Sequence, residues 1–300
     1  MSDSEICLQT QIESIVPAPK ILNPDLKLIE MWVHGKSIYT QDQYRRYATQ
    51  FLRFVDKPLS QVTLADLQAF ATGVADKGLA DASQRLILSA VKSLMAFGHK
   101  IGVLPVNVGA VIEAPKVKDA LSERILSEAD VMKMTMLETD SRNRLIIRLL
   151  YACGLRVSEL CQLTWSNLQS RSEGQGQVTV FGKGGKTRVV IVPAPVWKEL
   201  MEHRGRRKAD PNMPVFRSRK RGGHLTRATV TQIVQAAAIR AGISADVSAH
   251  WLRHAHASHS LERGAPIHLV QQTLGHSSVA TTGRYLHARP TDSSSRYLPL

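Results

Sequence analysis

The second half of the sequence carries side chains that could together perform chemistry on a phosphate. They are two arginines, two histidines, a lysine and a tyrosine: Arg156, Lys183, His250, Arg253, His276 and Tyr285. Guanidinium groups bind phosphate through paired hydrogen bonds, whereas imidazole, ammonium and phenol groups transfer protons or act as nucleophiles. If the fold brings them together, these residue types suit phosphoryl transfer in which side chains supply the positive charge.

Two of the cations occur in informative local surroundings. His250 and Arg253 are three residues apart, so on a helix they would lie on one face. Arg156 follows an apolar segment, where an unpaired guanidinium is costly. Two interpretations explain an arginine at position 156: an ion pair with Glu159, or a guanidinium that binds a phosphate through two hydrogen bonds. The two interpretations are compatible if Glu159 positions a neighbouring group.

Lys183 lies in the glycine-rich segment 182–187, between two runs of β-branched residues. A phosphate-binding loop of nucleoside triphosphatases would need a glycine at position 180, which is Val180, and a following helix. The segment is therefore interpreted as a turn, either simply solvated or carrying a lysine toward an anion. Its spacing does not decide between Lys183 and Lys186.

Two weaker patterns point elsewhere when each is taken alone. His250 and His254 have the spacing of a zinc-binding pair on a helix, but Trp251 stands where a glutamate would be expected and no acidic third ligand is evident. Tyr285 alone would be interpreted as a packing residue. We therefore expect no metal and no organic cofactor.

Hydrophobic periodicity predicts a mainly α fold with a small β-hairpin or sheet, of the α+β class. The expected divisions are an irregular lead (1–22), a helical domain (23–110), a linker (111–121), a second domain (122–289) and a tail (290–300). Asn23 and Thr63 are predicted to begin helices, Gly98 to end the helix that starts near residue 82, and Ser141 to cap the helix that Gly154 breaks. The runs 177–181 and 188–192 predict the hairpin.

Charge is distributed unevenly along the chain. The formal net charge is +14, and residues 118–300 hold 27 Lys and Arg against 14 Asp and Glu, whereas residues 1–117 hold 12 against 11. Such a basic domain attracts polyanions. No apolar run reaches the ~18 residues of a membrane span, and no signal peptide is recognised. The three cysteines indicate a reducing compartment, so a cytoplasmic location is expected.

In this order, Arg156, a hairpin lysine, His250-x-x-Arg253, Leu274-Gly275-His276 and Tyr285 resemble the tyrosine recombinase (phage integrase) family, in particular its Xer-like or integron-integrase-like members. The resemblance covers essentially the whole chain. It implies an N-terminal helical core-binding (SAM-like) domain that clamps DNA, followed by a catalytic domain. It also implies site-specific recombination of double-stranded DNA through a 3′-phosphotyrosine, in integration, excision or resolution. The expected assembly is a homo-tetramer on two DNA sites, with or without a second recombinase.

The same resemblance assigns the roles of the six residues. Tyr285 is the nucleophile, and Arg156 and Arg253 hold the scissile phosphate. His250 transfers a proton, His276 hydrogen-bonds the phosphate, and Lys183 protonates the leaving 5′ oxygen. Two alternatives stay open: a type IB topoisomerase-like enzyme, and a non-catalytic DNA-binding protein that retains the fold. The tail ending in Tyr-Leu-Pro-Leu is expected either to dock on a neighbouring protomer or to fray.

Overall fold

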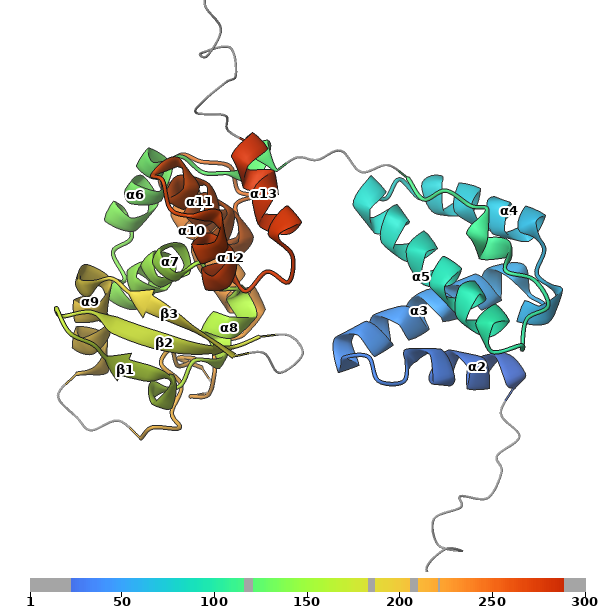
Figure 1. The fold of residues 1–300 in the computed structure, drawn as a ribbon, viewed down its shortest axis with the longest axis horizontal. Helices are drawn as coiled ribbons and strands as arrows, with labels where there is room; N and C mark the ends of the chain where they lie inside the picture. The colour runs from blue at the N-terminus through green and yellow to red at the C-terminus, as the bar shows by residue number, and fades with distance from the viewer. Residues whose placement is uncertain (1–22, 116–120, 183–186, 206–209, 221, 289–300) are drawn as a thin grey trace, which may run out of the picture. The chain divides into compact units, whose positions relative to one another are not determined.

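The computed structural model describes residues 23–115, 121–182, 187–205, 210–220 and 222–288 (Figure 1). The chain separates into two compact units, Met1–Lys118 and Asp119–Leu300. Each unit has its own buried apolar core. Across the described ranges, no helix combines the length and the apolar character needed to cross a bilayer.

The first unit is helical throughout its described part. Its helices are α2 (Pro24–Val33), α3 (Ile38–Val55), α4 (Leu64–Ala75) and α5 (Asp81–Lys100), with 3-10 turns at Leu59–Gln61 and Val108–Ala110. The predicted starts at Asn23 and Thr63 are confirmed. The Asn23 side chain accepts from the Asp25 backbone N–H, and Thr63 and Asp66 cap each other reciprocally.

The predicted end of a helix at Gly98 is wrong, because α5 continues to Lys100. A β carbon added to Gly98 would lie 2.7 Å from the Leu104 side chain. The glycine is therefore needed for close packing against the returning chain and not for termination. The helix ends just before Gly102, which takes the left-handed conformation with φ 76°.

The second unit combines helices with a small antiparallel sheet. Its helices are α6 (Glu128–Met136), α7 (Ser141–Cys153), α8 (Val157–Gln162), α9 (Ala194–Arg204), α10 (Arg227–Arg240), α11 (Ala249–Glu262), α12 (Ile267–Leu274) and α13 (Val279–Ala288), with 3-10 turns at Ser122–Arg124 and Trp165–Asn167. The strands are β1 (Leu168–Ser170), β2 (Gly176–Phe181) and β3 (Thr187–Val192), in the order β1-β2-β3. The α+β class is confirmed, and the predicted hairpin gains β1 as a third strand.

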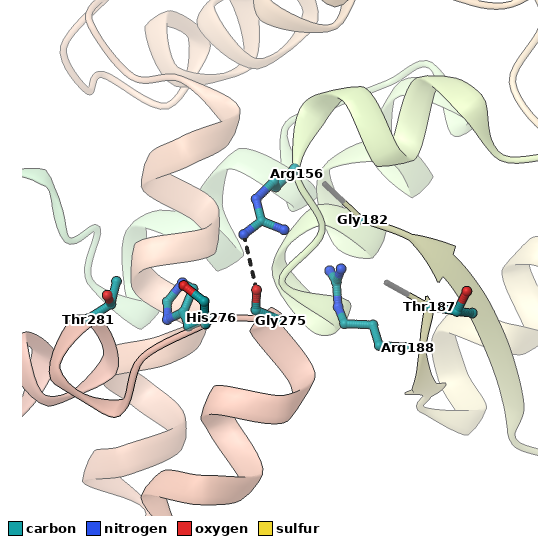
Figure 2. Close-up of a pocket in the computed structure, with 8 residues that line it drawn as sticks. Arg156, Gly182, Thr187, Arg188, Gly275, His276 and Thr281 are labelled. Atoms are coloured by element: carbon teal, nitrogen blue, oxygen red, sulfur yellow. Dashed lines mark hydrogen bonds between the residues drawn. The ribbon is translucent and has the colours of Figure 1, made fainter. Parts of the chain in front are cut away.

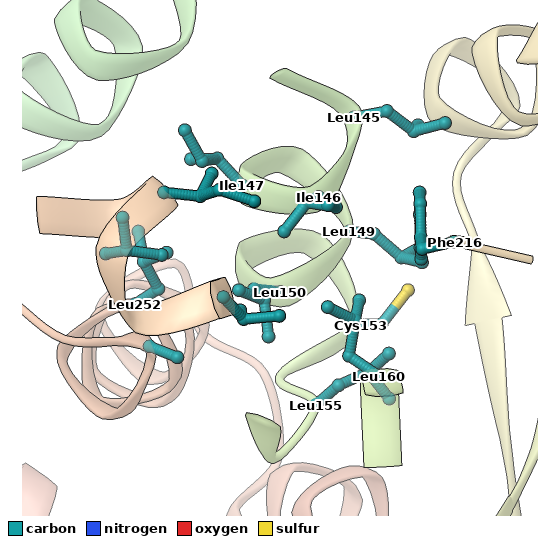
Figure 3. Packing of buried hydrophobic residues seen from close by; sticks show 14 of the residues in the cluster. Leu145, Ile146, Ile147, Leu149, Leu150, Cys153, Leu155, Leu160, Phe216 and Leu252 are labelled. Atoms are coloured by element: carbon teal, nitrogen blue, oxygen red, sulfur yellow. The ribbon is translucent and has the colours of Figure 1, made fainter. Parts of the chain in front are cut away.

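Helix α7 lies at the centre of the second unit, in contact with α6, α9, α11 and β3. Figure 3 shows its apolar side chains packed against Leu252 of α11 and against Phe216. The helix is capped by Asp140, whose carboxylate accepts from two backbone N–H groups, so the expected cap at Ser141 is displaced by one residue. The predicted break at Gly154 is confirmed: φ is 56°, and an added β carbon would lie 2.7 Å from Leu274.

Candidate active site

Arg156 lies at the N-terminal end of α8, directly after the turn at Gly154. Its backbone N–H donates to Glu159 Oε2 at 2.7 Å, and its Nη1 donates to Glu159 Oε1 at 2.9 Å. Its Nη2 lies 3.5 Å from the carbonyl oxygen of Gly275. The expected ion pair with Glu159 is present, and because the Arg156 side chain stays 37% exposed, it can also meet an anion.

Arg253 projects from α11 into the interior and is only 1% exposed. Its Nη1 donates to the Gly154 carbonyl, and its Nη2 donates to the Leu274 carbonyl at 2.5 Å. These carbonyls lie at the C-terminal ends of α7 and α12, where helices leave acceptors unpaired and the helix dipole favours a cation. Arg253 thus joins two helix ends, and Arg156 and His276 each follow one of these two carbonyls by two residues.

His276 follows Gly275, which closes α12 in the left-handed conformation with φ 65°. Its Nδ1 lies 2.9 Å from the hydroxyl of Thr282, a residue with 0% exposure. When that hydroxyl donates, the His276 proton sits on Nε2 and is available to a ligand. In that tautomer, the Thr282 contact orients the imidazole as a hydrogen-bond donor toward the neighbouring cavity.

Tyr285 lies in α13 and is 5% exposed. Its hydroxyl lies 2.7 Å from His254 Nδ1, and its ring is nearly parallel to that of His276, with centroids 6.4 Å apart. Burial raises the pKa of the Tyr285 phenol, against the lowering effect of Arg253 and Arg284. In this arrangement the phenol is protonated and bound to His254.

His250 is exposed near the start of α11, and its ring centroid lies 4.5 Å from that of His254. With Tyr285, whose ring is 5.6 Å from His254, the two histidines form a row of three rings. In the part of the chain that the structure describes, no three His, Cys, Asp or Glu side chains come close enough together to hold a metal ion.

The histidines of the site are kept neutral by their surroundings. Burial, the neighbouring His250 and Arg253 lower the pKa of His254 to about 3. Burial and the charges of Arg253 and Arg156 lower the pKa of His276 to about 4. Partial burial and the same two arginines also lower the pKa of His250. At neutral pH these imidazoles can therefore both donate and accept hydrogen bonds.

A cavity of about 450 Å³ opens beside these residues (Figure 2). Its lining is Arg156, Gly182, Thr187, Arg188, Gly275, His276, Ser277 and Thr281. Two guanidinium groups and one imidazole come from three separate segments, and the described lining contains no carboxylate. A cavity with this lining favours an anion. Tyr285 is not part of the described lining, so its hydroxyl must turn to reach a ligand there.

Lys183, like Lys186, lies outside the described residues. The chain on either side is described: β2 ends at Phe181 and β3 begins at Thr187. Of the six predicted residues, the structure brings five together around the ends of α7, α11, α12 and α13. Their catalytic roles stay predictions.

Arg188 and His254 contact the site but were not among the predicted residues. Arg188 binds both oxygens of Glu159 and lines the cavity. Its sequence signal is that position 188 lies two and four residues before the buried valines at 190 and 192, on the same face of the strand. His254 was noted only as one half of a zinc-like pair, and nothing in its spacing indicates the contact with Tyr285.

Comparison with known proteins gives the family. The model of the Phage integrase family matches residues 123–292, more than half of the chain. The chain belongs to the phage integrase family. The family's N-terminal SAM-like domain matches residues 28–96 of this tyrosine recombinase. The predicted family and the predicted types of the two domains are confirmed.

Curated relatives match this phage integrase family member over most of its length. Tyrosine recombinase XerC of Xanthomonas campestris pv. campestris (strain B100) is 34% identical over 259 residues, which cover 84% of this chain and 79% of the relative. Tyrosine recombinase XerD of Vibrio cholerae serotype O1 (strain ATCC 39315 / El Tor Inaba N16961) is 33% identical over 285 residues, covering 89% and 93%. The Xer-like assignment follows from these identities.

Solved structures share the fold. The XerA recombinase is 29% identical with a TM-score of 0.51, over 93% of this chain and all of that chain. The post-cleavage complex of XerH with its palindromic difH substrate has a TM-score of 0.73 at 21% identity, covering 91% and 84%. A lambda integrase tetramer on a Holliday junction has a TM-score of 0.70 at 22% identity, covering 90% and 78%.

Proposed function

We propose that this chain is a site-specific DNA recombinase that cleaves and rejoins strands through a 3′-phosphotyrosine. The observation that carries the proposal is the convergence of Arg156, Arg253, His276 and Tyr285 beside one positively lined cavity. The Tyr285 oxygen attacks phosphorus, the bond from phosphorus to the 5′ oxygen breaks, and a 5′ hydroxyl is released. Rejoining is the reverse reaction with the 5′ hydroxyl of another strand.

The phosphate is held by cations that the fold places in advance. The exposed part of the Arg156 guanidinium faces the cavity and can bind non-bridging oxygens, and His276 can donate from Nε2. Arg253 supplies a second positive charge from a buried position, where electrostatic stabilisation is stronger than in water. Because these groups are fixed by backbone carbonyls and Thr282, little rearrangement is needed as charge develops on the phosphate.

Two protons must move during cleavage. The Tyr285 proton leaves as the phenol attacks, and we assign its acceptor to His250, whose lowered pKa keeps its ring neutral at pH 7. The 5′ oxygen needs a proton as it leaves, which we assign to Lys183. The hydrogen bond from Tyr285 to His254 must be exchanged for the approach to phosphorus, so the described arrangement precedes attack.

The partners and location follow from the same chemistry. The substrate is double-stranded DNA, with residues 23–110 and 122–289 proposed as the DNA clamp and the catalytic domain, joined by the linker 111–121. Exchange between two sites needs a cleaving protomer for each of four strands, so a homo-tetramer is proposed. The lambda integrase relative is a tetramer on a Holliday junction. A cytoplasmic location is proposed because the proposed substrate is DNA.

Covalent capture tests the proposed function directly. The protein is incubated with a pool of duplexes that have a randomised centre and nicks from which a short 5′-hydroxyl fragment diffuses away after cleavage. We expect adducts that survive denaturing detergent, joined through a 3′ phosphate to Tyr285 by peptide mapping. Sequencing the trapped DNA gives the site. No adducts would favour a non-catalytic DNA-binding protein, and plasmid relaxation by single protomers without joining of two sites would favour a topoisomerase.

Arg156→Lys is expected to slow single-turnover cleavage of the captured duplex by about 100-fold, with DNA affinity within about threefold of wild type. A single ammonium nitrogen lacks the planar fork with which Arg156 contacts Glu159 and the turn at Gly275 through separate nitrogens while still facing a phosphate. Arg171→Lys, at an exposed arginine just after β1, is the matched control and should cleave normally. Near-wild-type cleavage by Arg156→Lys would contradict the phosphate-binding role.

A further inference from the structure

Arg188 holds three segments of the site at once, although it is not one of the six residues assigned by resemblance. It lies in β3, and its side chain is 12% exposed. Nη1 and Nη2 donate to the two oxygens of Glu159 at 2.8 Å each, and Nε donates to the Thr273 carbonyl at 2.7 Å. Every guanidinium nitrogen therefore has a partner, in α8 or in α12.

Glu159 is shared between two arginines. Its side chain is 4% exposed, and its oxygens accept two hydrogen bonds from Arg188 and two from Arg156. Burial raises the pKa of the carboxyl group, but the bonds from Arg188 and from the Arg156 backbone outweigh it, so the pKa is lowered and Glu159 stays ionised. One carboxylate balances one guanidinium. With Arg188 bound to both oxygens, the charge of Arg156 remains available to a third partner.

The turn that carries His276 is built around Arg188. A β carbon added to Gly275 would lie 3.1 Å from Arg188 Cδ and 3.2 Å from its Nη1, at a left-handed φ of 65°. The carbonyls of residues 273–275 meet Arg188, Arg253 and Arg156 in that order. Arg188 thus fastens the end of α12 to β3, on one side of the cavity in Figure 2.

We propose that Arg188 is a positioning residue for strand cleavage. It balances the charge of Glu159, so that Arg156 can bind the scissile phosphate, and it holds the turn before His276 against β3. This rests on the proposed function. Without Arg188, Glu159 would form its ion pair with Arg156 alone. Cleavage would then slow, although the groups assigned to the phosphate remain. Removing the Glu159 charge as well would then restore part of the rate.

The double variant separates this role from a merely structural one. On the captured nicked duplex, Arg188→Gln is expected to lower the single-turnover cleavage rate by about 100-fold, with DNA affinity within about threefold of wild type. Arg188→Gln combined with Glu159→Gln should cleave about tenfold faster than Arg188→Gln alone. A residue needed only for stability predicts the opposite, since the second change removes further hydrogen bonds. Lys198→Gln, which removes one exposed charge from α9, is the control and should cleave at the wild-type rate.

The Tm of each variant is measured by thermal unfolding alongside its cleavage rate. Arg188→Lys keeps the charge but loses the planar fork that donates to both Glu159 oxygens and to Thr273, so we expect cleavage about tenfold slower in a protein that is still folded at the assay temperature. It carries the test if Arg188→Gln unfolds at the assay temperature. A double variant no faster than Arg188→Gln, or wild-type cleavage by Arg188→Lys, would overturn the proposal. Absence of adducts with the wild-type protein would instead reject the proposed function, whatever Arg188 does.

Discussion

Tyr285→Phe is expected to abolish covalent protein–DNA adducts while DNA affinity stays close to that of the wild type. The substitution removes one oxygen, and that oxygen is the atom proposed to bond to phosphorus. The expected fall in single-turnover cleavage is more than about 10⁴-fold, because no other group replaces a missing nucleophile. The fold loses only the hydrogen bond to His254, which contributes about 1 kcal/mol. A gel assay for adducts, with binding measured in parallel, reads both quantities.

A second tyrosine of the same unit provides the matched control. The Tyr151 hydroxyl, in α7, lies 2.9 Å from Nδ1 of His259 in α11. It therefore repeats the contact between Tyr285 and a histidine of α11 at another position of the same helix. Tyr151→Phe should keep both cleavage and binding. Adducts that persist in Tyr285→Phe would show that another residue attacks, and adducts lost in Tyr151→Phe would show that the assay reports packing.

Much of the fold could be predicted because its signals are local. Asn23 and Thr63 cap the helices that follow them, and Gly154 takes the left-handed conformation that ends α7. Such signals need only a few neighbouring residues. The order of the site motifs was likewise readable along the chain. Strand β1 was not predicted because it is only three residues long. It forms a strand through its pairing with β2, and its own sequence has no β-rich run.

The contacts that assemble the site were not readable in the same way. Gly98 has the signature of a helix end, but its role depends on Leu104 coming back against α5. Arg188 meets Glu159 and Thr273 across 29 and 85 residues of sequence. Periodicity describes which face of an element is buried, and it does not specify which residue of another element meets that face. The partner of His254 was hidden for the same reason.

Arg253→Met is expected to lower activity strongly while stability changes little. Methionine fills similar apolar space without charge or donors, and cleavage should fall by about 10³-fold or more because a buried cation next to the phosphate is lost. Burial and the charge of Arg156, partly offset by Glu159, lower the pKa of Arg253 to about 9 from its ordinary value of 12.5. The folded state therefore holds this charge at a cost in free energy.

Two opposing terms set the stability of Arg253→Met. Removing the charge recovers about 5 kcal/mol, at 1.36 kcal/mol per pKa unit. Leaving the carbonyls of Gly154 and Leu274 without their donor costs about 1–3 kcal/mol each. These terms nearly cancel, so we expect a Tm within a few degrees of the wild type in calorimetry. The cationic side chain is then explained by what it does for the phosphate, not by what it contributes to folding.

The control for this substitution is an arginine that does not line the cavity. Arg148, in the middle of α7, pairs with Glu199 of α9, and Arg148→Met deletes a guanidinium from the same unit without touching the lining. It should cleave at the wild-type rate. A large loss of Tm in Arg253→Met would mean that its inactivity reflects unfolding, and wild-type cleavage at an unchanged Tm would remove Arg253 from the phosphate site. The buried position of Arg253 predicts that the variant is inactive in cleavage but stably folded.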